Sequence, residues 1–260
     1  MNRINKLFRE KKKNILSVYF TAGFPALDDT GEIIIQLQKA GADMIEIGIP
    51  FSDPLADGPV IQKSSQKAIQ NGMKIKVLFS QLQNIREQVH VPLLLMGYLN
   101  PVYQYGIDNF MKKCQETGID GLILPDLPLK EYEEEYQSKM EAHGLKNVFL
   151  ISPNTTEDRI KKIDDLSSGF IYMVSTSSTT GARSGISSQQ EKYFDRVKLM
   201  NLKNPRLIGF GISNHSSFSV ACQHAHGAII GSAFIQAIEE GNANLGKTIP
   251  SFIKNIIDKK

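Results

Sequence analysis

The sequence predicts an α/β protein folded as a single (β/α)8 barrel, with an extra helix at its N-terminus. Short apolar runs alternate with helical segments along the chain, eight such runs occur, and 260 residues match the size of one TIM barrel. Because no linker or low-complexity segment interrupts the alternation, we expect one domain over residues 1–260. An open doubly wound sheet is the alternative, but the chain lacks the G-x-G-x-x-G fingerprint of dinucleotide-binding sheets.

The predicted strands are continuous apolar, β-prone runs, which are typical of parallel strands buried on both faces. They comprise residues 15–21, 43–49, 91–98, 120–126, 147–152, 169–175, 206–211 and 227–232.

The segments between these runs have apolar residues at spacings of three and four, which predicts amphipathic helices. They comprise residues 28–41, 75–88, 109–118, 129–144, 156–169, 188–201 and 215–227. The pattern of residues 2–13 predicts a short helix that caps the N-terminal end of the barrel. The pattern of residues 245–260 predicts a last helix on the outside of the barrel.

Glycines punctuate the chain where a helical segment gives way to an apolar run. A glycine in the left-handed conformation commonly ends a helix, so each of these glycines is expected to be a helix stop. They are Gly41, Gly118, Gly144, Gly169 and Gly227.

Composition excludes several classes of function. The net charge is only +3, and the run Lys11–Lys13 has no interleaved aromatic residues, so a solvated helix end is favoured over a nucleic-acid site. The two cysteines form no C-x-x-C pair, which argues against a disulfide framework or a zinc site. No apolar run approaches the roughly 20 residues of a membrane span. We therefore expect a soluble, cytoplasmic protein that contacts neither membrane nor nucleic acid.

Glu46 is the first candidate functional residue, because it interrupts the apolar run 43–49. Side chains alternate along a strand, so Glu46 lies on the face opposite Ile45 and Ile47, which suit packing against helices. Inside the barrel, loss of hydration raises the pKa of a carboxyl towards neutrality, as a general acid or base requires. The alternative is that Glu46 is paired with a buried basic group or hydroxyl for structural reasons alone.

Asp57, in the loop after this strand, is the second candidate. The loops after the strands form the active site of such a barrel, and Pro50, Pro54 and Pro59 limit the freedom of this loop. The equal alternative is that Asp53 and Asp57 are ordinary turn formers, because Asp-Pro and Asp-Gly are turn dipeptides.

Tyr172 lies in the run 169–175, and an inward side chain would place its phenol near the mouth of the barrel. A core tyrosine with a satisfied hydroxyl is the equal alternative. The stretch 176–188 that follows is rich in hydroxyls and glycines, which is typical of a mobile lid; a disordered connection is the alternative.

Glycine-rich turns follow the last two predicted strands, at residues 209–213 and 229–233. Backbone N–H groups in such turns, with a helix beginning behind Gly231 and Ser232, are typical of an anion site. Phosphate sites in this fold recur after strands seven and eight, and no Walker motif is present, so we expect a small phosphorylated substrate.

Apolar and aromatic residues are expected to line the site around a partly apolar substrate. They are Tyr19, Tyr98, Leu99 and Phe210. None of the five histidines has a metal-ligand spacing at the end of a strand, so no metal site is expected.

The motif "IEIGIPFSDPLADGPVIQ", residues 45–62, closely resembles the signature of the tryptophan synthase alpha subunit family. The similarity continues over nearly the whole chain in "YFTAGFP", "MGYLNPVYQYG", "GLILPDLP", "LISPNT", "TTGARSG", "IGFGIS" and "GAIIGSAF". The resemblance implies a lyase of tryptophan biosynthesis that cleaves indole-3-glycerol phosphate to indole and glyceraldehyde 3-phosphate by a retro-aldol reaction.

The resemblance also implies a role for individual residues. Glu46 and Asp57 correspond to the catalytic pair, and Tyr172 to a tyrosine near them. Phosphate contacts and a lid threonine are implied for Gly181, Gly211, Gly231, Ser232 and Thr180. The sequence of the expected lid differs from that of many family members, which have arginine and glycine where this chain has Thr176 and Ser178.

A partner is implied as well: the pyridoxal-phosphate-containing beta subunit, in an α2β2 tetramer. The implied contact residues are Asp53, Pro54, Asn100 and Pro128. The chain itself is expected to hold no cofactor. Two alternatives remain, namely a barrel that mainly binds and activates the beta subunit and a stand-alone lyase that releases indole. A phosphosugar-isomerase barrel would not explain the motif at residues 45–62.

Overall fold

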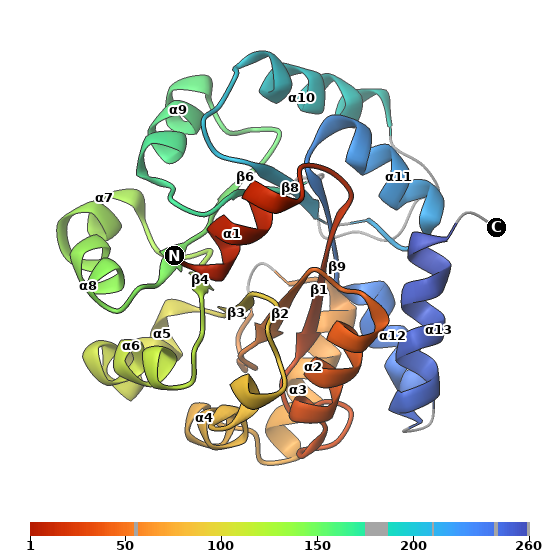
Figure 1. Cartoon of the computed structure of the whole chain (residues 1–260). Helices are drawn as coiled ribbons and strands as arrows, with labels where there is room; N and C mark the ends of the chain where they lie inside the picture. Colours follow the sequence, from red (N-terminus) through yellow and green to blue (C-terminus); the bar gives the residue numbers. More distant parts are fainter. Residues whose placement is uncertain (55–56, 175–186, 210, 242–243, 259–260) are drawn as a thin grey trace.

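The computed structural model describes residues 1–54, 57–174, 187–209, 211–241 and 244–258. Within these residues, nine parallel strands form one sheet at the centre, and helices surround it (Figure 1). The predicted α/β class and (β/α)8 barrel are confirmed, and the extra N-terminal helix is present as α1 (Arg3–Glu10).

The sheet closes on itself between its two edge strands. Its order is β5-β4-β3-β2-β1-β9-β8-β7-β6, and only Val148 separates the edge strands β5 and β6 along the chain. The single strand expected at 147–152 is therefore two segments, because this run pairs first with β4 and then with β7. The strands are β1 (Ile15–Thr21), β2 (Met44–Gly48), β3 (Leu93–Met96), β4 (Gly121–Ile123), β5 (Lys146–Asn147), β6 (Phe149–Ile151), β7 (Ile171–Val174), β8 (Arg206–Gly209) and β9 (Gly227–Ile230).

Helices follow the strands and cover the outer face of the sheet (Figure 1). They are α2 (Asp29–Ala40), α3 (Pro59–Gln70), α4 (Ile75–Leu82), α5 (Leu99–Tyr105), α6 (Ile107–Glu116), α7 (Leu129–Glu131), α8 (Gln137–Ala142), α9 (Glu157–Leu166), α10 (Ser188–Leu199), α11 (His215–His224), α12 (Ser232–Glu240) and α13 (Leu245–Ile257). A 3-10 turn, η1 (Ile85–Glu87), follows α4, and a π-helical turn, η2 (Tyr132–Tyr136), joins α7 to α8. None of the helices in the described ranges combines the length and the apolar character of a bilayer-crossing segment.

Helices α3, α5 and α12 lie outside the segments for which periodicity predicts a helix, although the glycine-rich turn at Gly231 and Ser232 indicates that a helix begins there. The buried residues of α3 are Ser64, Ser65 and Ala68, which have little hydrophobic character. Ser64 Oγ lies 2.7 Å from Thr21 Oγ1 of β1 in a buried hydrogen bond. A helix that packs through small and hydroxyl-bearing side chains leaves no apolar stripe in the sequence.

The glycine stops are only partly as expected. Gly41, Gly118 and Gly144 adopt positive φ at helix ends, with φ values of 103°, 72° and 70°. The prediction of a left-handed helix stop is wrong for Gly169 and Gly227, because neither has a positive φ. At Gly227 the reason for glycine is close approach of two strands, since a Cβ there would overlap the carbonyl oxygen of Ile15.

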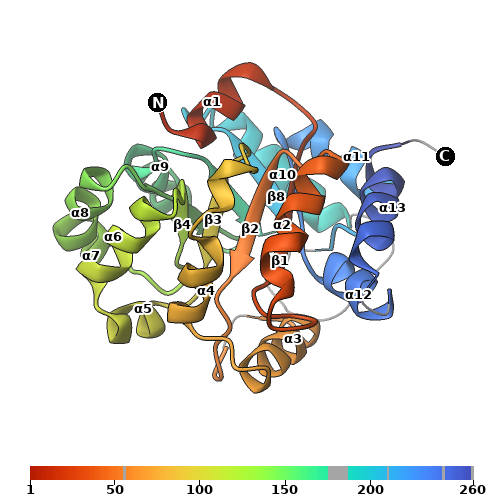
Figure 2. The ribbon, with the colours of Figure 1, turned by 60° about the horizontal axis from the view of Figure 1, so that its bottom comes forward.

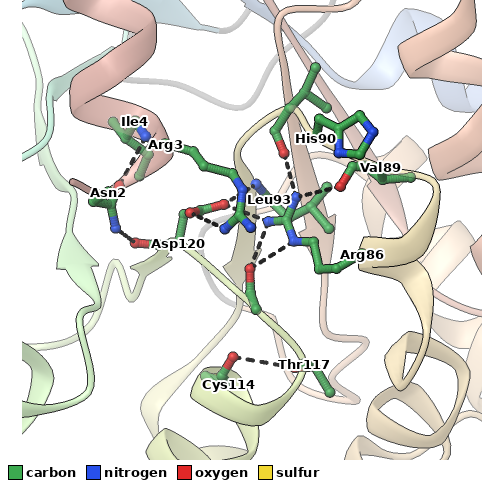
Figure 3. A network of polar contacts seen from close by, with 12 residues as sticks. Asn2, Arg3, Ile4, Arg86, Val89, His90, Leu93, Cys114, Thr117 and Asp120 are labelled. Atoms are coloured by element: carbon green, nitrogen blue, oxygen red, sulfur yellow. Dashed lines mark hydrogen bonds and ion pairs between the residues drawn. The ribbon is translucent and has the colours of Figure 1, made fainter.

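Helix α1 lies across the amino-terminal end of the barrel, as predicted, and α3 lies at the other end (Figure 2). Ile4 and Phe8 are buried beneath α1. The Asn2 side chain donates a hydrogen bond of 2.8 Å to the carbonyl oxygen of Asp120, just before β4 (Figure 3). It donates a second one of 2.9 Å to the carbonyl oxygen of Gly144, just before β5. This end of the barrel is closed, and the candidate site lies at the carboxyl ends of the strands.

Candidate active site

Glu46 lies in the middle of β2 and is fully buried. The Ser17 hydroxyl, on the neighbouring strand β1, donates a hydrogen bond of 2.7 Å to Glu46 Oε1. Within the described residues, Glu46 Oε2 has no hydrogen-bond partner. Burial raises the pKa of Glu46 to about 7, and the hydrogen bond from Ser17 acts in the opposite direction. The carboxyl is therefore able both to donate and to accept a proton near neutral pH.

Tyr172 of β7 approaches Glu46 through the interior of the barrel. Strands β1, β9 and β8 separate β7 from β2 in the sheet. Burial raises the pKa of Tyr172, and the charge of Glu46 is the next cause, so the two side chains face a common interior. The Tyr172 hydroxyl lies against Gly209 of β8, where a Cβ would overlap it.

Tyr19 of β1 contributes a second phenol to the same region. It pairs with Glu46 in the register of β1 and β2, and its ring lies against Gly48 and Gly231. Burial is the main cause that raises the pKa of Tyr19, followed by the charge of Asp57. The Asp57 carboxyl therefore lies close to Tyr19, although the two belong to different segments.

Asp57 is held in place from two other elements. The Tyr98 side chain, after β3, makes a hydrogen bond with the Asp57 carboxyl. The Tyr98 ring packs on Phe51 with ring centroids 5.3 Å apart, and Gln62 Nε2 of α3 donates to the Asp57 carbonyl oxygen at 2.8 Å. Burial raises the pKa of Asp57 to about 6, and the hydrogen bond from Tyr98 opposes this rise. Asp57 is thus ionised at neutral pH in a partly buried place.

The two carboxyls suit different tasks. Glu46, with a pKa of about 7, can carry a proton back and forth. Asp57, with a pKa of about 6, can accept a hydrogen bond and stabilise positive charge. Two neighbouring carboxyls whose pKa values burial raises towards neutrality are typical of acid and base chemistry on a bound molecule.

The glycine-rich turns lie at the carboxyl ends of β8 and β9. Gly211 has a positive φ of 77° and is exposed. Gly231 is the N-cap of the nine-residue helix α12, and Ser232 is the first residue of that helix. The first N–H groups of a helix have no acceptor within it, so this arrangement can bind an anion.

The four residues implied as partner contacts follow β2, β3 and β4 at the same end of the barrel. Asp53, Asn100 and Pro128 are exposed, and Pro54 is partly buried. The backbone N–H of Leu99 donates to the Asp126 carboxylate at 2.9 Å and 3.0 Å, which ties the loop after β3 to the loop after β4. Together these loops present one rim around the site.

Three of the expected site residues lie outside the described residues: Thr180, Gly181 and Phe210. The stretch expected as a lid, with Thr176 and Ser178, also falls largely outside them. Within the described ranges, no group of three or more His, Cys, Asp or Glu residues is placed to hold a metal ion.

Ser17 is the residue at this site that sequence reasoning missed. It is a fully buried hydroxyl within the apolar run 15–21, on the same face as Tyr19. A polar residue within an apolar strand is the sequence signal that could have marked Ser17 as a site residue, but the sequence does not show which group the hydroxyl contacts.

The comparisons with known proteins agree on one family. Residues 5–256 match the model of the family described as Tryptophan synthase alpha chain. The chain belongs to this family. Among tryptophan synthase alpha chains, that of Flavobacterium psychrophilum is 57% identical over 256 residues, covering 98% of this chain and 100% of that one. The alpha chain of Christiangramia forsetii is 56% identical over 257 residues, covering 98% of both.

Solved structures of tryptophan synthases have the same fold. The A-subunit from the hyperthermophile Pyrococcus furiosus superposes with a TM-score of 0.86 at 34% identity, covering 95% of this chain and 98% of that one. Tryptophan synthase from M. tuberculosis in its aminoacrylate-bound form gives a TM-score of 0.85 at 27% identity, covering 98% of each chain. As a tryptophan synthase alpha chain, the protein is a carbon–carbon lyase that cleaves indole-3-glycerol phosphate to indole and glyceraldehyde 3-phosphate.

Proposed function

We propose that Glu46 and Asp57 carry out the retro-aldol cleavage of indole-3-glycerol phosphate. The observation that supports this most is the pair of carboxyls whose pKa values burial raises to about 7 and about 6, beside the buried phenol of Tyr19. Each carboxyl has the protonation state that one part of the reaction requires.

Glu46 acts first as the proton donor. The carbon–carbon bond can break only after C3 of the indole ring is protonated, and the protonated Glu46 carboxyl supplies that proton. The resulting carboxylate then accepts the proton of the glycerol hydroxyl as the bond breaks. The bonding electrons return to the ring, the hydroxyl carbon becomes the aldehyde of glyceraldehyde 3-phosphate, and Glu46 regains its proton.

Asp57 stabilises the intermediate. Protonation at C3 puts positive charge on the ring nitrogen, and a carboxylate that accepts a hydrogen bond from the ring N–H lowers the energy of this state. The hydrogen bond from Tyr98 supports this role, because it favours the ionised form of Asp57.

The remaining site residues hold the two ends of the substrate. We place the phosphate at Gly211, Gly231 and Ser232, where α12 begins, and assign further contacts to Thr180 and Gly181. The indole ring is held by an apolar and aromatic lining. The lining residues are Tyr19, Tyr98, Leu99, Tyr172 and Phe210.

The proposed partner is a tryptophan synthase beta subunit, which holds the pyridoxal phosphate, in an α2β2 tetramer. The family and its solved complexes support this, since a tryptophan synthase complex from Pyrococcus furiosus superposes on the chain with a TM-score of 0.86. The exposed residues Asp53, Asn100 and Pro128 follow three adjacent strands at the end of the barrel where the site lies, so a partner bound there would lie close to the released indole.

Glu46→Gln tests the proposed chemistry. This variant keeps the shape of the side chain but cannot carry the proton, so indole release should fall by about a hundredfold or more with little change in KM. Glu10→Gln, an exposed change on α1 at the closed end of the barrel, is the control and should leave turnover unchanged. Near-normal turnover of Glu46→Gln would contradict the proposal.

The two alternatives are separated by measuring indole release with and without a beta subunit. Full release without the partner favours a stand-alone lyase. A chain that raises the activity of the partner but releases no indole favours a subunit that mainly binds and activates.

A further inference from the structure

Ser17 and Glu46 form a buried side-chain pair beneath the reacting centre. Ser17 is fully buried on β1, two residues before Tyr19, and Tyr19 is the residue that pairs in register with Glu46. The Glu46 side chain therefore leans back towards the amino-terminal end of the barrel to accept the hydrogen bond of 2.7 Å from Ser17 Oγ.

The pair makes the two carboxyl oxygens of Glu46 unequal. Oε1 accepts the hydrogen bond from Ser17, whereas Oε2 is buried and has no hydrogen-bond partner within the described residues. While the Ser17 hydroxyl donates to Oε1, the proton of the neutral carboxyl is carried by the other oxygen, Oε2. The exchangeable proton therefore belongs on Oε2.

We propose that Ser17 is a positioning residue for the cleavage reaction, which fixes the orientation of the Glu46 carboxyl and leaves Oε2 as the oxygen that exchanges a proton with the substrate. This inference rests on the proposed role of Glu46. It adds a requirement that the catalytic pair does not contain, namely a hydroxyl at position 17.

The electrostatics of the site agree with this geometry. Burial raises the pKa of Glu46, and the hydrogen bond from Ser17 is the contribution that lowers it again towards neutrality. Among the described residues, the titratable groups that face this interior are Tyr19, Tyr172 and Asp57. The pKa values of both phenols are raised, so they stay neutral, and of these three groups Asp57 is the one that changes charge near neutral pH.

Two variants of equal shape isolate the hydroxyl. Threonine and valine have nearly the same volume and branching, and only threonine retains a hydroxyl, so Ser17→Thr and Ser17→Val form a matched pair. Ser17→Ala removes the hydroxyl without adding volume. The measurement is the pH dependence of kcat/KM for indole release, together with kcat and KM at one pH.

Loss of the hydroxyl should move the kinetic pKa of Glu46 upward. The reaction starts from the protonated carboxyl, so activity falls as pH rises through this pKa. In Ser17→Ala and Ser17→Val this alkaline limb should move to higher pH by about half to one unit, with kcat reduced and KM little changed. Ser17→Thr should keep the limb near its original place.

Two results would overturn the proposal: an alkaline limb that stays in place in both Ser17→Ala and Ser17→Val, or equal shifts in Ser17→Thr and Ser17→Val. If these variants are too weakly active to assay, the pH dependence of their stability decides. Ser17→Val should lose more stability than Ser17→Thr between pH 5 and pH 8, and equal losses reject the role. Normal activity in Glu46→Gln would instead reject the proposed function itself.

Discussion

The Tyr19 ring on β1 occupies the space in front of Gly48 on β2, so its hydroxyl lies where a side chain at position 48 would begin. Tyr19 pairs in register with Glu46, two residues before Gly48, and its ring leans along the strand direction. The lack of a side chain at Gly48 therefore allows a phenol to lie next to the buried carboxyl.

Gly48→Ala should displace this ring. The new methyl group overlaps the Tyr19 hydroxyl, and overpacking of this kind costs about 1–3 kcal/mol of unfolding free energy. We expect kcat/KM to fall at least about tenfold, because the ring lines the site beside Glu46. Gly31→Ala in α2 is the control, since no described atom lies within 4 Å of the added Cβ, and it should be fully active. Parent-like activity and stability in Gly48→Ala would refute this placement of Tyr19.

Ionisation of Glu46 should make the stability of the protein depend on pH. Its pKa is about 7 in the folded protein against an ordinary value of 4.5. Below pH 4.5 the Glu46 carboxyl is protonated in both the folded and the unfolded protein. As pH rises from 4.5 through 7, the carboxyl ionises first in the unfolded chain, so the free energy of unfolding falls by about 3 kcal/mol. The glutamine of Glu46→Gln cannot ionise. The unfolding free energy of this variant, measured by urea denaturation, should therefore be higher relative to that of the parent at pH 8 than at pH 5. The same pH dependence in both proteins would argue against a raised pKa.

Tyr98→Phe should shift the acid limb of the activity profile. Asp57 must be ionised to stabilise the positive charge that develops on the indole ring, so activity falls as pH decreases through its pKa of about 6. Without the Tyr98 hydroxyl this pKa rises, and the acid limb of kcat/KM should move up by about half to one pH unit. Tyr103→Phe changes an exposed tyrosine on α5 and should leave the profile unchanged. If the acid limb of Tyr98→Phe stays where it is in the parent, Tyr98 does not lower the pKa of Asp57.

Asp120→Ala should destabilise the protein without disturbing the chemistry. The buried Asp120 carboxylate accepts from Arg86 Nη2 at 2.5 Å, from Arg3 Nη1 at 3.1 Å and from the backbone N–H of Leu93 at 3.0 Å (Figure 3). Removing it leaves Arg86 partly buried without its counter-charge, which should cost about 3–5 kcal/mol in urea denaturation.

The matched control for this change is Asp108→Ala, which breaks the exposed pair with Lys139 and should leave stability nearly unchanged. The folded Asp120→Ala protein should keep its kcat, since Asp120 lies at the closed end of the barrel. Equal stability of the two variants would show that the buried network contributes little.

The strands were predictable because their burial on both faces makes each one a continuous apolar run. The predicted run 15–21 coincides with β1, and 43–49 differs from β2 by one residue at each end. The break at Val148 was not predictable, because it arises where the sheet closes and one run changes neighbours. Helix α3 was missed because its buried face carries Ser64 and Ser65.

At the site, alternation along β2 was enough to direct Glu46 towards the interior. The partners of the two carboxyls were not predictable, because they come from other strands and loops. Ser17 lies 29 positions from Glu46, and Tyr98 reaches Asp57 from the loop after β3.

The sequence by itself determined the class of fold, the inward direction of Glu46 and, through its motifs, the family. These depend on local periodicity and on residue identity, which one chain carries in full. The tertiary structure decided which oxygen of Glu46 is occupied, which phenols share its interior and how far its pKa rises. Those properties depend on burial and on contacts between distant segments, which exist only once the barrel has closed.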